Sequence, residues 1–148
     1  MAVEPVLARH FDLTVNTGTE GSPVWTPIAG ITGITPGGSS QKTDDTDFDN
    51  DGWDAHSVVQ RGRSLSVAMN YKEDPDTNAL DLGQQTLIDL GNQTGLDAKA
   101  QFRYLSPGGT GYIARFSVDL NFPGGDKVNN ATFSADLTMD GAPTEVTP

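Results

Sequence analysis

The amino-acid sequence predicts an α+β fold that is mainly β, an antiparallel β-sandwich or partial barrel with one flanking α-helix and a long loop. Three observations predict it. The 148 residues include 17 Gly and 9 Pro, which implies many turns and few long helices. Several segments alternate between apolar and polar residues, as strands with one buried face do. Only one segment combines a helix-start signal with a helical apolar stripe.

The first third of the chain predicts two strands and the long loop. Residues 11–15 alternate between apolar and polar side chains. Residues 24–34 are apolar but contain a proline, which cannot donate to a sheet ladder, so we expect an irregular or edge strand. Residues 36–57 lack periodicity, and a loop of this length is usually functional or disordered. Its aromatic residues, Phe48 and Trp53, argue against plain disorder.

The rest of the chain predicts four more strands and the helix. A regular strand at 64–71 precedes Asp74-Pro75-Asp76, which has the composition of a helix start. We expect residues 78–90 to form the helix, and Gly91 is a suitable stop. Three alternating strands follow at residues 98–104, 112–122 and 131–139. We expect one domain over residues 1–141 and a flexible C-terminal tail over 142–148.

Charge and composition exclude several classes of function. The net charge of −11 opposes binding to nucleic acid or to an anionic membrane. The absence of cysteine excludes disulfides and thiolate zinc sites. The N-terminus has neither the basic region nor the apolar run of a signal peptide, so we expect a cytoplasm-like compartment.

No pattern of residues predicts an enzyme or a cofactor. The two histidines, His10 and His56, lie outside any nucleophile-elbow motif. The glycine-rich residues 108–111 join two alternating segments, which indicates a hairpin turn rather than a phosphate-binding loop.

An acidic stretch within the long loop has the spacing that opens a calcium-binding loop. Asp47, Asp49 and Asp51 precede Gly52 in the order D-x-D-x-D-G. An EF-hand needs a bidentate Glu at the twelfth position, which here is Val58, and no predicted helix precedes the loop. A calcium site of another kind, built from the three carboxylates and backbone oxygens, stays open.

The predicted outward faces of the long strands carry small, uncharged side chains and a few acids. A freely solvated sheet usually carries more Lys and Glu, so this face is either ordinary solvated surface or a smooth polar wall. Long regular strands also leave edges that invite pairing with another chain. Either those edges are covered, or pairing with a neighbour is part of the function.

Four features follow one another along nearly the whole chain. They are a pair of N-terminal strands with a Trp, an acidic Thr-rich loop ending in T-x-F-x-x-x-G-W at Thr46–Trp53, a D-P-D segment leading into the helix at 74–90, and long final strands ending in Asp140-Gly141. In this order they resemble tail tube (major tail) proteins of long-tailed bacteriophages.

The resemblance implies a structural subunit of the virion, assembled in the host cytoplasm, with no catalysis. Six copies would join their sheets side by side into a ring. Rings would stack around a tape-measure protein, meet tail-end proteins, and form a conduit through which DNA passes without specific binding. The alternative is a small acidic calcium-binding β-domain for adhesion or partner binding.

The resemblance also suggests two groups of site residues. Phe48 and Trp53 would anchor the loop at a subunit interface, unless both fold back on their own core. The candidates for the lumen are the small or acidic outward residues Ser117, Asp119, Thr132, Ser134 and Asp136. An acidic wall of this kind repels phosphate over only about 8–10 Å at physiological salt.

Overall fold

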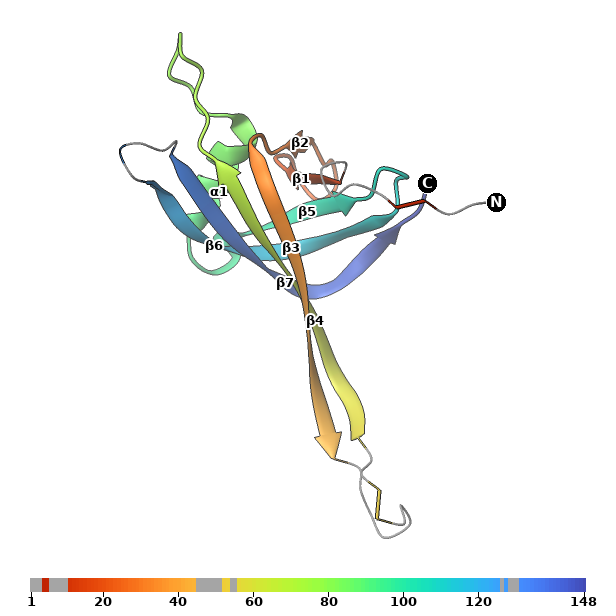
Figure 1. The fold of residues 1–148 in the computed structure, drawn as a ribbon. Helices are drawn as coiled ribbons and strands as arrows, with labels where there is room; N and C mark the ends of the chain where they lie inside the picture. Colours follow the sequence, from red (N-terminus) through yellow and green to blue (C-terminus); the bar gives the residue numbers. More distant parts are fainter. Residues whose placement is uncertain (1–3, 6–10, 45–51, 54–55, 126, 128–130) are drawn as a thin grey trace.

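One antiparallel, open sheet of seven strands forms most of the structure, in the order β2-β1-β5-β6-β7-β4-β3 (Figure 1). This computed structural model describes residues 4–5, 11–44, 52–53, 56–125, 127 and 131–148. The strands are β1 (Asp12–Asn16), β2 (Trp25–Pro27), β3 (Ile31–Asp44), β4 (His56–Asn70), β5 (Lys99–Leu105), β6 (Gly111–Gly124) and β7 (Thr132–Val146). In the described ranges, the helices are α1 (Leu82–Gly91) and a short 3-10 helix, η3 (Gly95–Ala98).

The core lies on one face of this sheet, as the alternation predicts. Leu65, Val67 and Met69 of β4 are buried, and so are the alternate apolar residues of β5, β6 and β7. The mainly β class is therefore confirmed, but the sheet neither closes into a barrel nor splits into a sandwich. The physical reason is that β7 pairs with β4 through its first half and with β6 along most of its length, which keeps every strand in one curved sheet.

Helix α1 begins at Leu82, four residues later than predicted. The Asp74-Pro75-Asp76 segment makes a turn instead, because the Asp74 carboxylate accepts from the amide of Asp76 and the Asn78 amide donates to the Asp74 carbonyl. Asp81 is the actual N-cap, and its carboxylate accepts from the backbone amides of Gln84 and Ala29.

The start of α1 packs closely against the segment that follows β2. A Cβ built on Gly83 would lie 2.4 Å from the Pro27 carbonyl oxygen and 2.8 Å from the Ile28 Cα, so only glycine permits this approach. Gln84 is fully buried beside it. Gly83 is thus a packing residue at the start of the helix.

The predicted long loop is largely a β-hairpin. Strands β3 and β4 pair from Ile31 opposite Met69 out to Asp44 opposite His56, and they project well beyond the rest of the sheet (Figure 1). The loop prediction was therefore wrong for residues 36–44 and 56–57. These residues are polar on both faces because both faces are exposed, so the pairing leaves no alternation in the sequence.

The last strand also continues past its predicted end at Gly141. Strand β7 reaches Val146, which pairs with Gly111. Gly141 has a φ of 89°, and the register between β6 and β7 shifts at this point. The Asp140-Gly141 signal therefore marks a bulge within a strand, where glycine adopts a left-handed conformation easily. In the described part of the chain, no helix has the length and apolar character needed to span a membrane.

Candidate functional site

The outer face of β6, β7 and β4 is a polar surface on the side of the sheet opposite the core. The pairing registers align Asp119 of β6, Asp136 of β7 and Ser66 of β4 in one row across it. The Ser66 hydroxyl donates to the Asp136 carboxylate. In the next row, the Asn121 amide donates to the Ser134 hydroxyl at 2.9 Å. The side chains in these two rows are short.

All the residues suggested for the lumen lie on this outer face. Asp119, Thr132 and Asp136 are exposed, whereas Ser117 and Ser134 are half-buried. The Ser117 hydroxyl donates to the Thr138 carbonyl across the strand pair at 3.4 Å. The residues that the sequence pattern identifies therefore form one continuous surface on the adjacent strands β6 and β7. That this surface faces a lumen is a separate proposal.

Two cations at one end of this face are paired with acids. Lys99 Nζ lies 3.2 Å from Asp140 Oδ2, and the Arg115 guanidinium donates to the Glu20 carboxylate. That hydrogen bond with Glu20, aided by its charge, raises the pKa of Arg115. Asp119 and Asp136 lie directly opposite each other, and neither forms an ion pair with any residue that the structure describes.

Replacing Asp119 by Asn is expected to stabilise the protein by about 0.2–1 kcal/mol, because like charges directly opposite each other in a strand pair destabilise it. The midpoint of urea unfolding measures the change. Asp76→Asn, at an exposed turn with no acid opposite it in a strand pair, is the matched control for the general loss of negative charge. An equal shift in both variants would show that the pair carries no specific repulsion.

The projecting hairpin carries exposed apolar side chains near its far end. Trp53 is 78% exposed, and Val58 and Val59 are 42% and 58% exposed. Trp53 therefore does not fold back on the core of its own chain in this structure. Phe48, its suggested partner, lies outside the described residues.

No metal site emerges from the described part of the chain, which has no group of three or more His, Cys, Asp or Glu able to hold an ion. Asp47, Asp49 and Asp51 lie outside it, so the calcium hypothesis stays a prediction. His56 is an exposed residue at the start of β4.

The sequence interpretation missed two arginines near the base of the hairpin. Arg61 and Arg63 line a pocket between the hairpin and β7. A signal was present, because both residues continue the period-two row of Leu65 and Val67 on β4.

Comparison with known proteins supports the fold. No protein-family model and no curated protein matches the chain. A chain in the solved structure "Virion of native gene transfer agent (GTA) particle" matches with a TM-score of 0.65 and 15% identity, over 97% of this chain and 100% of that one. A chain in "Tail of empty GTA particle computed with helical refinement, C6 symmetry" matches with a TM-score of 0.60 and 22% identity, over 90% and 94%.

At these identities the likeness is one of fold. It extends over nearly the whole of each chain, and it agrees with the resemblance to tail tube proteins of long-tailed bacteriophages. The chain therefore has the same fold as components of a gene transfer agent virion and of its tail.

Proposed function

We propose that this protein is a structural subunit of a phage-type tail tube. Six copies form a ring, rings stack into a tube, and the tube conducts DNA during ejection. The observation that carries the proposal is the match in fold to a chain from a tail with C6 symmetry, over 90% of this chain. The role needs neither catalysis nor a cofactor.

The edges of the open sheet support self-assembly. Strand β3 has 14 residues and is hydrogen-bonded only to β4 within the sheet, and the opposite edge is the short strand β2. Edges of this kind offer unpaired backbone groups to another chain. A head-to-tail contact between two different edges closes into a ring when the rotation allows it, and rings then stack.

The outer polar face supports the idea of a DNA conduit. Its middle carries short side chains on β6 and β7, and Asp119 and Asp136 give that part negative charge. Phosphate that comes within about 8–10 Å of such a wall is repelled at physiological salt, so DNA would slide past rather than bind. We propose that this face lines the bore, around a tape-measure protein before ejection, with tail-end proteins closing the tube.

Negative-stain electron microscopy of the purified protein over a range of concentrations tests the proposal. We expect rings or tubes of uniform diameter at high concentration. A protein that stays monomeric at every concentration, and whose melting temperature rises with added calcium, would contradict the proposal and support the calcium-binding domain instead.

A further inference from the structure

Strands β4 and β7 separate to form a fork at the base of the hairpin. They pair from Asn70 opposite Thr132 to Ser64 opposite Thr138. Beyond that point β4 continues along β3, while β7 bends away along β6 (Figure 1). The space between them is a pocket of about 620 Å³. Its walls include Ser39 and Ser40 of β3, Arg61 and Arg63 of β4, and Met139 and Pro143 of β7.

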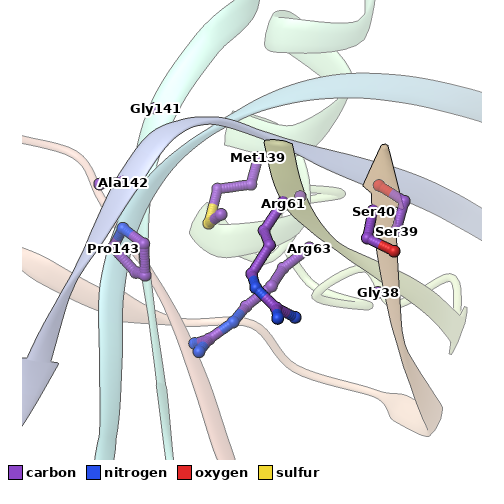
Figure 2. A pocket seen from close by; sticks show the side chains of 10 residues that line it. Gly38, Ser39, Ser40, Arg61, Arg63, Met139, Gly141, Ala142 and Pro143 are labelled. Atoms are coloured by element: carbon purple, nitrogen blue, oxygen red, sulfur yellow. The ribbon is translucent and has the colours of Figure 1, made fainter. Parts of the chain in front are cut away.

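Both arginine side chains extend into this fork, between the hairpin strands and Pro143 (Figure 2). The Arg63 guanidinium lies 4.8 Å from the centre of the Tyr112 ring, and its Nη1 is 3.6 Å from a carboxylate oxygen of Glu145. Both partners of that ion pair are well exposed, so water screens it strongly.

Arg61 forms no ion pair and no side-chain hydrogen bond with any other residue that the structure describes. A chain of net charge −11 thus places two of its nine cations in one pocket, and the Arg61 guanidinium has no acidic partner among the residues that the structure describes. The guanidinium groups present planar sets of donors that suit carboxylates, so the pocket fits an acidic segment.

We propose that the fork binds the Asp-rich segment 44–54 of a second copy of this chain, which would be one of the contacts between subunits of the proposed tube. The inference rests on the proposed function. It adds which segment of a neighbouring subunit the fork binds. Its main argument is charge complementarity. The segment carries six Asp, at positions 44, 45, 47, 49, 51 and 54, and no cation.

The geometry of the hairpin favours a second copy over the same chain. Arg61 pairs with Ser40, whereas the described strands end at Asp44 and His56. Four to five residues of extended strand separate these positions, which is roughly 13–17 Å at the rise of a β-strand. The paired strands therefore hold the start of the acidic segment away from the fork of its own chain, where it can meet a neighbour.

Binding of a labelled peptide to the full-length protein tests the pocket directly. The probe is a fluorescent peptide of residues 43–54, followed by anisotropy. We expect Arg61→Gln with Arg63→Gln to weaken its binding by about ten-fold or more, because charge-assisted contacts to carboxylates are lost. Lys72→Gln with Lys127→Gln removes the same charge at exposed sites outside the fork and should leave binding unchanged.

Three results of this experiment would overturn the proposal. They are no binding of the peptide to the wild-type protein, equal binding to the arginine variant, and displacement of the peptide by a short DNA duplex at a lower concentration than by unlabelled peptide. The last result would assign the pocket to nucleic acid. A peptide with Asn in place of every Asp should not bind, since the recognition depends on charge.

A charge exchange between two variants tests whether the contact is made between copies. One variant carries Arg61→Asp and Arg63→Asp, and the other carries Asp45→Arg, Asp47→Arg, Asp49→Arg and Asp51→Arg, which changes the charge of its segment from −6 to +2. Each variant alone is expected to form few tubes, because its segment and its fork carry charge of the same sign. Their mixture should form tubes again, because the acidic segment of the first variant meets the basic fork of the second, and the basic segment of the second meets the acidic fork of the first. A mixture that stays unassembled while wild-type protein forms tubes would contradict a contact in trans.

The peptide-binding and tube-assembly experiments also distinguish a failure of this inference from a failure of the proposed function. Peptide binding that depends on the arginines, in a wild-type protein that forms no rings or tubes, would support the pocket and contradict the tube. Tubes that form normally in the Arg61→Gln, Arg63→Gln variant would support the tube and contradict the pocket.

Discussion

Replacing Gln84 by Leu is expected to lower the free energy of unfolding by roughly 3–5 kcal/mol, because buried polar groups left without partners cost about 1–3 kcal/mol each. Gln84 has no exposed surface. Its side-chain amide donates to the backbone carbonyls of Ala29 and Asn70, both at 2.7 Å, and its carbonyl accepts from the amide of Lys72 at 3.1 Å. Leucine fills similar space, but its side chain cannot form a hydrogen bond with any of these three backbone groups.

Urea unfolding followed by circular dichroism measures this change. Gln85→Leu is the matched control, because Gln85 is an exposed neighbour on the same helix, and its side chain donates to the Asp89 carboxylate at the surface. We expect the control to lie within about 0.5 kcal/mol of the wild-type protein. A Gln84→Leu variant as stable as the control would show that this side chain does not hold the helix to the segment after β2 and to the end of β4.

Replacing Trp53 by Ala is expected to block tube assembly while leaving the stability of the monomer nearly unchanged. The side chain is 78% exposed, so its removal costs the isolated chain little packing. In an assembled interface, a buried Trp is a frequent hot spot, and its truncation typically costs about 2 kcal/mol or more. Summed over every contact in a tube, a loss of this size would leave few assemblies.

Light scattering over time measures assembly of this variant, and thermal melting at low concentration measures its stability. Phe122→Ala is the control, since Phe122 is a 58% exposed aromatic residue on β6, away from the hairpin. Normal assembly of Trp53→Ala would contradict an interface role for this residue. A large loss of melting temperature with assembly intact would instead assign Trp53 to the stability of the monomer.

The parts of this fold that the sequence predicts well are those in which one face is buried and the other exposed. In β7, Phe133, Ala135 and Leu137 are buried and alternate with exposed or half-buried polar residues. A strand has a side-chain period of two, so burial of one face appears directly in the order of residues. The same alternation selected the outer polar face, because its residues are the complement of the buried set.

The parts that the sequence does not predict depend on contacts between distant residues. The hairpin beyond Pro36 is exposed on both faces, so its pairing leaves no apolar pattern. The pocket around Arg61 and Arg63 exists only because β7 bends away from β4 at the bulge near Gly141. The late start of α1 follows from Asp81, which is fixed by its bond to Ala29, 52 residues earlier in the chain. Local propensity carries none of this information.

A helical reconstruction of tubes assembled from the purified protein tests the central claim most directly. The claim predicts stacked six-fold rings in which sheets of neighbouring subunits join through their edges, with the outer face of β6 and β7, including Asp119 and Asp136, turned toward the axis. A tube with that face on its outer surface would contradict the proposed conduit, and a protein that forms no closed ring would contradict the proposed function itself.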